Sequence, residues 1–199
     1  QTGMIDYQGV DGNVVLPTEY RDRTVIGDPN PDFFGGITNN FYYKNFDLSI
    51  MGQFSYGNDI FNYNLFTALS GFNNSSNGLV DWVDRWRQPG DITDVPRVSP
   101  GDLNNATISD RFVEDGSFFR LRNITLGYTF SDAVNAKLRT KGFRWYFTVQ
   151  NAFVFTKYRG YDPEVASSHG GANTGLIHGY DYGSYPQPRI FTTGVNITF

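Results

Sequence analysis

The run from Asp81 to Arg87, DWVDRWR, holds the residues of this sequence best suited to contacting a substrate. Indole rings stack on sugar rings, and Asp and Arg side chains hydrogen-bond hydroxyl groups or peptide carboxylates. We therefore expect substrate contact from Asp81, Trp82, Arg85, Trp86 and Arg87. The spacing of Trp82 and Trp86 also suits one face of a short helix. The alternative is that the tryptophans only pack this segment, because a long ordered loop needs a core of its own.

Two pairs of carboxylates have a spacing that would suit glycoside hydrolysis, in which one acid protonates the leaving group and a second attacks or activates water. The pairs are Asp162 with Glu164, and Asp91 with Asp94. Both lie among Pro and Gly in turn-like sequence, where an Asp side chain commonly braces its own backbone. The sequence also lacks a nucleophile elbow, a phosphate-binding glycine loop and a zinc helix motif. We therefore predict no catalytic residue and no enzyme activity.

The metal-ligating residues are few. Asp91, Asp94 and Asp102 offer carboxylates for calcium, but without the spacing of an EF-hand. The two histidines, His169 and His178, are nine residues apart without a fixed carboxylate partner, which makes a poor metal site. The absence of cysteine excludes thiol catalysis, disulfides and thiolate-bound metals. We predict no metal and no cofactor, with bound calcium as the alternative.

The composition narrows the class of protein. A net charge of −4 and a pI near 5.0 argue against nucleic-acid binding, which needs a basic face. The 22 glycines, 9 prolines and 17% aromatic residues favour strands and turns. No run approaches the roughly 20 apolar residues of a transmembrane helix. A mean hydropathy of −0.40 is still compatible with a membrane barrel, because every second strand residue of such a barrel faces its lumen.

Five stretches alternate with period two, which predicts strands with different surroundings on their two faces. They cover residues 37–43, 46–56, 123–130, 143–150 and 191–199. The strong patterns last about ten residues, the length that a tilted strand needs to cross a bilayer, whereas the strands of a soluble β-sandwich usually have about five or six. Aromatic residues cluster at the strand ends, as in the girdles of membrane barrels. We therefore predict an all-β fold of transmembrane barrel strands rather than a sandwich.

The connections between these strands alternate in length. Those at 44–45 and 131–142 are short, and those at 58–116 and 154–189 are long. In bacterial outer-membrane barrels the short turns are periplasmic and the long loops are extracellular. The pattern therefore predicts that 44–45 and 131–142 face the periplasm and that 58–116 and 154–189 face outward. Five strands cannot close a barrel, and an open sheet edge in hydrocarbon leaves backbone groups unpaired. Residues 1–199 are therefore predicted to be part of a larger barrel and not an autonomous domain. The start at Gln1, without a signal peptide, also suggests a segment of a longer protein.

Blocks of residues along nearly the whole chain resemble, in order, the C-terminal region of the SusC/RagA family of TonB-linked outer-membrane transporters of Bacteroidetes. The blocks are IGDPNPDF at 26–33, residues 36–40 with YKNFDL at 43–48, WRQPGDITD at 86–94 with Pro96-Arg97, VEDGSFFRLRNITLGYTF at 113–130, QN at 150–151, YRGYDPE at 158–164, YPQPR at 185–189 and the terminal Phe199. Each block alone is weakly specific, but the ordered series is highly specific.

The resemblance implies a large barrel of the 22-stranded plugged class in the outer membrane of a Gram-negative bacterium. It implies import of an oligosaccharide or oligopeptide, energised through TonB, with a SusD-like surface lipoprotein as a lid. The plug, the TonB-contacting segment and the lid lie outside these residues. This chain would supply lipid-contacting wall strands and external loops.

Two further roles follow from the resemblance. Polar strand residues would line the translocation path or hold the plug; these lumen-facing candidates are Asp47, Gln53, Asn123, Arg144 and Gln150. Phe199 with its alternating strand resembles the terminal signal read by the barrel assembly machinery.

Two alternatives to energised import stay open. One is an outer-membrane adhesin or passive porin without energised transport, and the other is an extracellular carbohydrate-active enzyme.

Overall fold

The computed structural model describes residues 3–9, 12, 14–15, 23–69, 78–98, 107–165 and 178–199. The chain divides into two compact units. The loop unit comprises Gln1–Pro29, Asp59–Glu114 and Val165–Ser184, and the sheet unit comprises Asn30–Asn58, Asp115–Glu164 and Tyr185–Phe199. None of the helices in the described ranges is long and apolar enough to cross a bilayer.

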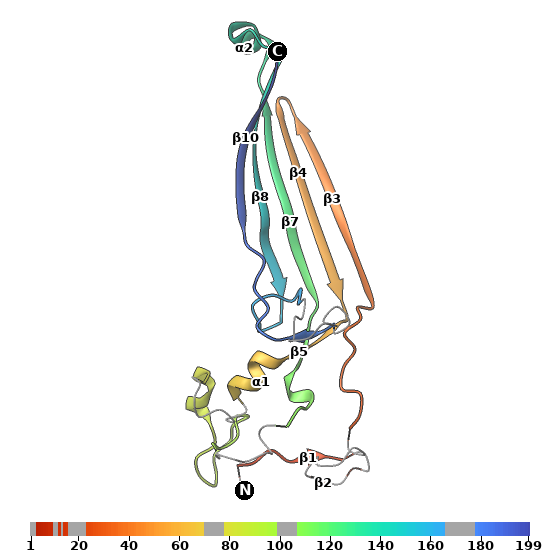
Figure 1. The fold of residues 1–199 in the computed structure, drawn as a ribbon, viewed down its shortest axis with the longest axis vertical. Coiled ribbons are helices and arrows are strands. Elements are labelled where there is room, and N and C mark those ends of the chain that lie inside the picture. The colour runs from red at the N-terminus through yellow and green to blue at the C-terminus, as the bar shows by residue number, and fades with distance from the viewer. Residues whose placement is uncertain are drawn as a thin grey trace, which may run out of the picture. The chain divides into compact units, whose positions relative to one another are not determined.

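The sheet unit is one antiparallel sheet of five long strands in the order β10-β8-β7-β4-β3 (Figure 1). The strands are β3 (Phe33–Tyr43), β4 (Phe46–Tyr56), β7 (Phe118–Thr129), β8 (Gly142–Thr156) and β10 (Ile190–Thr198). All five predicted strands are therefore confirmed, and β4 has the predicted bounds. Their order follows from the chain, since each short or long connection joins neighbours in the sheet.

The register gives the sheet two unlike faces. Asp47, Ser49 and Met51 on β4 pair with Gly127, Thr125 and Asn123 on β7, and Leu48 and Ile50 pair with Leu126 and Ile124. Paired residues share a face, so one face is mainly polar and the other apolar. The apolar face leaves large side chains exposed; they include Phe33, Ile37, Phe41, Tyr43, Phe46, Phe119, Leu126, Trp145, Phe153, Phe155, Phe191 and Val195. An exposed apolar surface of this extent needs an apolar environment.

Two neighbouring irregularities interrupt the alternation. Between β4 and β7 the register shifts at Met51/Gly52, where Arg122 is the extra residue of β7. Between β7 and β8 the register shifts at Leu121/Asn123, and Asn151 adopts the left-handed region with φ 50°. Asn tolerates this conformation better than most residues. The bulges explain why the predicted patterns covered only 123–130 and 143–150, although β7 starts earlier and β8 ends later.

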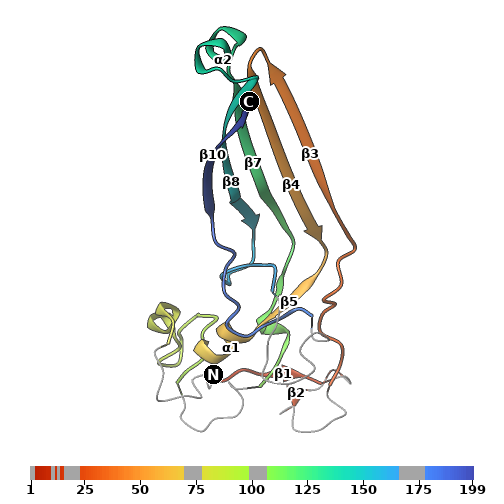
Figure 2. The same cartoon turned by 45° about the horizontal axis from the view of Figure 1, so that its top comes forward.

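The short connections meet at one end of the sheet, the short-turn end (Figure 2). The β3–β4 turn has Lys44 at φ 53°, and Asn45 exchanges hydrogen bonds with the Thr129 backbone at 2.8 and 2.7 Å. The connection from β7 to β8 contains a short helix, α2 (Asp132–Leu138), which periodicity did not predict. Its acidic first turn and basic last turn suit the helix dipole, and Arg139 ends it in the left-handed region.

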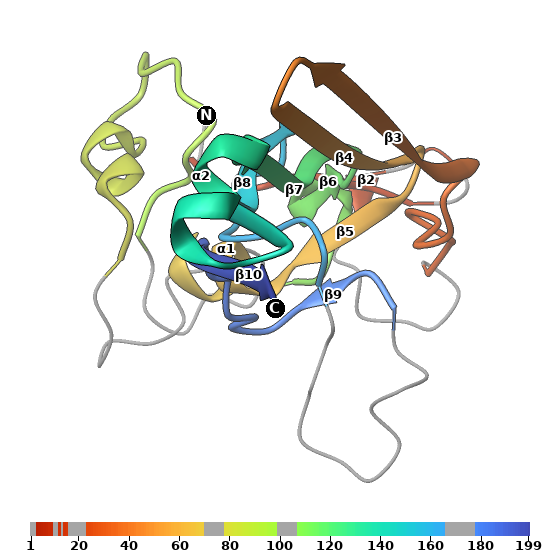
Figure 3. The same cartoon turned by 90° about the horizontal axis from the view of Figure 1, so that it is seen from above.

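The loop unit has its own small core. Strand β5 (Asp59–Asn62) lies between β6 (Val113–Asp115) and β9 (Tyr180–Asp181), and β1 (Tyr7–Gln8) pairs with β2 (Val14–Val15). Helix α1 (Tyr63–Leu69) follows β5 directly, as Figure 3 shows. Leu65, Leu69 and Phe112 form a buried cluster, and Phe61, Phe66 and Trp82 pack against it.

Candidate functional site

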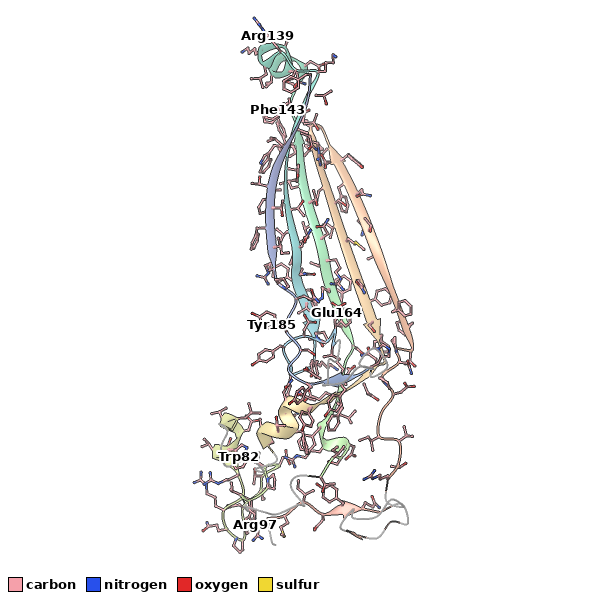
Figure 4. All side chains as sticks on the ribbon, in the orientation of Figure 1. Trp82, Arg97, Arg139, Phe143, Glu164 and Tyr185 are labelled. Carbon is pink, nitrogen blue, oxygen red and sulfur yellow. The ribbon has the colours of Figure 1, made fainter. Side chains whose placement is uncertain are left out.

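The sheet unit contains a cluster of two arginines and two carboxylates at the end of the sheet where the long connections begin. Arg120 and Arg122 come from β7, and Asp162 and Glu164 come from the segment after β8. Figure 4 labels Glu164 at this end of the sheet. We call these four residues the charged cluster. Arg120 and Asp162 are each 3% exposed. Burying charges this deeply is tolerated only when they are paired.

Arg120 joins both carboxylates. Its Nη2 donates to Asp162 Oδ1 at 2.5 Å, and its Nε lies 2.7 Å from Glu164 Oε2. The second contact is an ion pair without hydrogen-bond geometry, and neither of its two atoms has a hydrogen-bond partner among the described residues. Arg122 Nη2 binds the other carboxylate oxygen of Glu164. Each carboxylate therefore has at least one guanidinium partner.

Arg122 also holds the two bulged strands together. Its Nε donates to Gln53 Oε1 on β4 at 2.7 Å, and its Nη1 donates to Asn151 Oδ1 on β8 at 3.3 Å. Asn151 Nδ2 in turn donates to the Pro188 carbonyl at 3.0 Å. One guanidinium thus links three neighbouring strands and the segment after β8 at the level of the bulges.

Asp162 braces the backbone of two segments. Its Oδ1 accepts from the Glu164 N–H at 3.0 Å, and its Oδ2 accepts from the Gln187 N–H at 2.9 Å. The two ends of the long connection from β8 to β10 are therefore tied to each other and to β7. Removing one partner from such a buried ion network typically costs about 3–5 kcal/mol.

The sequence did not mark Arg120 and Arg122 as site residues. Their signal was two arginines at alternate positions in the aromatic block 118–123, followed downstream by the acidic block at 161–164. Four of the blocks that carry the family resemblance, at 113–130, 150–151, 158–164 and 185–189, meet in and around this cluster. The blocks therefore describe one interaction network rather than separate motifs.

The geometry does not favour acid–base catalysis by Asp162 and Glu164. Both carboxylates form ion pairs with Arg120, and Glu164 also binds Arg122. A glycosidase acid and nucleophile must be free to meet a substrate, whereas these carboxylates are occupied by arginine side chains and, for Asp162, by two backbone N–H groups as well. The cluster is built for holding segments in place.

The five lumen-facing candidates lie on the polar face of the sheet. The pairing of Met51 with Asn123, of Asn123 with Gln150 and of Gln53 with Arg120 places their side chains on one side. On the same face Arg144 Nη2 reaches Asp47 Oδ2 at 2.5 Å, and its guanidinium lies 5.8 Å from the Tyr146 ring. Farther along the same face, the hydroxyl groups of Thr125 on β7 and Thr148 on β8 form a hydrogen bond of 2.9 Å. The polar face is thus ordered by its own cross-strand contacts.

In the loop unit, Trp82 is a packing residue of the small core. Its Nε1 donates to the Ala68 carbonyl at 2.8 Å, and its ring packs against the buried cluster. The expected helical face is not formed, because the 3-10 helix Val80–Asp84 ends before Trp86 and Arg85 is extended. The backbone N–H of Trp86 instead donates to the Val95 carbonyl, and the Trp86 ring packs against Gly3.

The charged neighbours of these tryptophans turn toward backbone carbonyls. Arg85 Nη1 donates to the Trp82 carbonyl at 2.9 Å, and Arg87 Nη2 donates to the Val83 carbonyl at 2.6 Å. Asp81 is half-buried, whereas Arg87 is exposed. Arg87 is therefore the member of the candidate set best placed to meet a ligand.

The structure describes three of the residues considered as metal ligands, Asp91, Asp94 and His178, and none of them belongs to a metal-binding group. Asp91 Oδ2 accepts from the N–H groups of Arg87 and Gln88 at 2.8 and 3.0 Å, which is the bracing expected of a turn aspartate. Asp102 and His169 lie outside the described residues, and His178 is exposed. Within the described ranges no group of three metal-ligating side chains is present.

A tyrosine group in the loop unit has an unusual electrostatic environment. The rings of Tyr63 and Tyr180 have centroids 5.4 Å apart, and those of Tyr63 and Tyr182 are 5.0 Å apart. Burial raises the pKa of Tyr180 to about 12, with smaller contributions from Tyr63 and Tyr182.

Known proteins match this chain over nearly its whole length. It is 39% identical over 196 residues to the TonB-dependent receptor P3 of Formosa agariphila, which covers 97% of this chain and 19% of that protein. It is 32% identical over 197 residues to the TonB-dependent receptor SusC of Bacteroides thetaiotaomicron, covering 98% and 18%. A structure of the RagAB peptide importer in the "closed-closed" state matches with a TM-score of 0.75 at 21% identity, covering 97% of this chain and 20% of that one. No protein-family model matches. The chain spans about a fifth of the length of these proteins.

Proposed function

This chain belongs to the SusC/RagA family of TonB-dependent receptors, and we propose that it forms wall strands and external loops of an outer-membrane importer. The cargo is an oligosaccharide or an oligopeptide. Import is energised through TonB by a part of the receptor outside this chain, and a SusD-like surface lipoprotein works with it. The chain itself performs no covalent chemistry.

The two-faced sheet is the observation that carries this proposal. Its apolar face exposes Phe41, Leu126 and Phe191, and its polar face carries Asp47, Arg144 and Gln150. A wall between lipid and an aqueous or plugged lumen needs this division. The polar side chains then line the path of the cargo or hold the plug.

The charged cluster supports a second part of the proposal, concerning the external loops. It fixes the start and the end of the connection from β8 to β10 on the wall strand β7 through Asp162. With the short turns in the periplasm, this connection faces outward. A firmly held loop base gives the surface lipoprotein or the cargo a defined surface to meet.

The candidate residues of the first long connection keep a role in this proposal. Arg87 is exposed and offers a guanidinium to a carboxylate or hydroxyl of the cargo. Asp81, Arg85 and Trp86 are half-buried beside it and shape the same segment.

The test is uptake by cells that produce the full-length receptor, with fluorescent oligosaccharides and oligopeptides offered separately. We expect accumulation of one of the two classes that is lost when either TonB or the lipoprotein is deleted. Accumulation that survives loss of TonB would support the passive porin instead. Surface binding without accumulation would support the adhesin, and conversion of the labelled glycan by purified receptor would support the enzyme.

A further inference from the structure

The short-turn end of the sheet carries an excess of positive charge. Residues 44–45 and 131–142, which make up the two short connections, contain Lys44, Lys137, Arg139 and Lys141 but only one acidic residue, Asp132. All four basic side chains are exposed. In the described part of the chain, none of the four forms an ion pair with a carboxylate. We call these four residues the basic collar.

A row of aromatic rings lies directly beside the basic collar. Phe46 and Tyr128 have centroids 4.8 Å apart, Tyr128 and Phe130 are 5.0 Å apart, and Phe130 stacks on Phe143 at 4.4 Å. Because alternation puts Phe46, Tyr128 and Phe143 on the apolar face, the row borders the lipid-facing surface. Aromatic rows of this kind mark the level where hydrocarbon ends and headgroups begin.

The collar lies within reach of the headgroup layer. A bilayer has about 5–7 Å of headgroup region on each side of its hydrocarbon core. A strand rises about 3.3 Å per residue, so Lys141, two residues before Phe143, lies about 7 Å beyond the aromatic row. Lys44 directly follows the exposed Tyr43, and its Nζ lies 5.4 Å from that ring. Lys44 and Lys141 therefore lie within about the thickness of one headgroup layer from the aromatic row.

Helix α2 is held beside the same row. Buried Asn135 donates to the Phe130 carbonyl at 3.4 Å and accepts through its own carbonyl from the Thr140 N–H at 3.0 Å. These contacts keep Lys137 and Arg139 close to the strand ends, and long basic side chains can reach toward the interface from there.

From the charge excess, the aromatic row and the depth, we propose that the basic collar binds anionic phospholipid headgroups of the leaflet at the short-turn end. An acidic segment of another protein would not need the aromatic row, so lipid is the partner that accounts for both features. The proposal rests on the membrane-barrel function but not on import. Each basic residue near a membrane surface contributes roughly a fivefold gain in affinity for anionic lipid.

The experiment uses native mass spectrometry of the full-length receptor in detergent, with dioleoyl phosphatidylglycerol or dioleoyl phosphatidylcholine added at equal concentration. We expect wild type to retain more phosphatidylglycerol, and Lys137→Glu/Arg139→Glu/Lys141→Glu to reduce this retention at least about tenfold. The matched control is Arg23→Glu/Arg111→Glu in the loop unit, which should retain phosphatidylglycerol as wild type does.

Two results would overturn the proposal. The first is equal retention of the two lipids by wild type, and the second is an equal loss of phosphatidylglycerol in the control. Only protein that shows the heat-modifiable gel shift of a folded barrel is compared, and Lys141→Gln with Lys44→Gln gives a milder variant if the triple reversal does not fold. A receptor that retains phosphatidylglycerol but imports nothing would keep this inference and refute the proposed import.

Discussion

Arg144 on β8 pairs with Asp47 on β4 across the whole width of the intervening strand β7, with Nη2 and Oδ2 2.5 Å apart. The pair passes over Gly127, where a Cβ atom would overlap both the guanidinium and the carboxylate. A side chain at this position would therefore have to displace the charged ends of Asp47 and Arg144 from each other. The sequence marked Asp47 and Arg144 only as polar strand positions. Their contact with each other depends on the sheet register and could not be predicted from either position alone.

The first prediction concerns this crossing. Gly127→Ala should force Asp47 and Arg144 apart and destabilise the full-length receptor by about 1–3 kcal/mol, the usual effect of overpacking. The measurement is the midpoint of the heat-modifiable gel shift. Gly142→Ala on β8 is the control, because its nearest contacts, with Thr198, lie at 3.7 and 3.8 Å. Equal midpoints for the two variants would show that the crossing does not contribute.

The strands could be predicted because their alternation follows from surroundings that differ on the two faces. The prediction failed where the backbone breaks the alternation, at the bulges of Arg122 and Asn151, and so it missed the first residues of β7 and the last residues of β8. A bulge adds one residue to one strand of a pair, and its position depends on the neighbouring strand. The alternation within a single strand therefore cannot predict it.

The charged cluster could not be predicted for a different reason. Arg120 and Asp162 are 42 positions apart, and a pairing over that distance depends on the sheet register. The sequence did show that Asp162 lies in a bracing turn, and it does bond the Glu164 N–H. The expectation of a helical face for Trp82 and Trp86 was wrong, because the core draws Trp82 inward and the 3-10 helix stops at Asp84.

The second prediction tests the charged cluster. Arg120→Met leaves Asp162 and Glu164 short of a partner in a buried site, and we expect a loss of about 3–5 kcal/mol in the unfolding free energy of the receptor. Denaturant titration with tryptophan fluorescence measures it. Lys157→Met, at an exposed position after β8, should change stability by no more than about 0.5 kcal/mol.

A double-mutant cycle checks that the effect comes from the pair itself. Asp162→Asn alone should also destabilise, and Arg120→Met with Asp162→Asn should lose less than the sum of the two. Strictly additive losses would mean that the two side chains act independently, against the contact of 2.5 Å.

The third prediction tests the proposal that the apolar face of the sheet contacts lipid. Leu126 is on the apolar face of β7 and 36% exposed, so Leu126→Arg should cost about 2–4 kcal/mol if the position is near the bilayer midplane. Yield of folded receptor in outer membranes and its heat resistance are the readouts. Ser49→Arg on the polar face is the control. Normal yield and heat resistance of Leu126→Arg would refute the lipid-facing assignment.

The fourth prediction follows from the raised pKa of Tyr180. The folded loop unit keeps Tyr180 protonated to a pH of about 12, whereas an unfolded tyrosine ionises at about 10. The stability from its burial is therefore complete below pH about 10 and is lost as pH rises toward about 12. The tyrosinate absorbance of wild type minus Tyr180→Phe isolates this group. A difference curve with its midpoint near pH 10 would contradict the burial.

The last prediction separates packing from ligand contact in the first long connection. Trp82→Ala removes a ring from the small core and the hydrogen bond to Ala68, so the loop unit should become sensitive to limited proteolysis. Arg87→Ala leaves that core intact, since Arg87 is exposed and its guanidinium hydrogen-bonds the Val83 carbonyl rather than a side chain among the described residues. We expect it to weaken cargo binding at least about tenfold without new cleavage, the loss of a charge-assisted hydrogen bond. If Arg87→Ala binds cargo as wild type does, while Trp82→Ala is cleaved, then this segment serves only as scaffold and the cargo contacts lie elsewhere in the receptor.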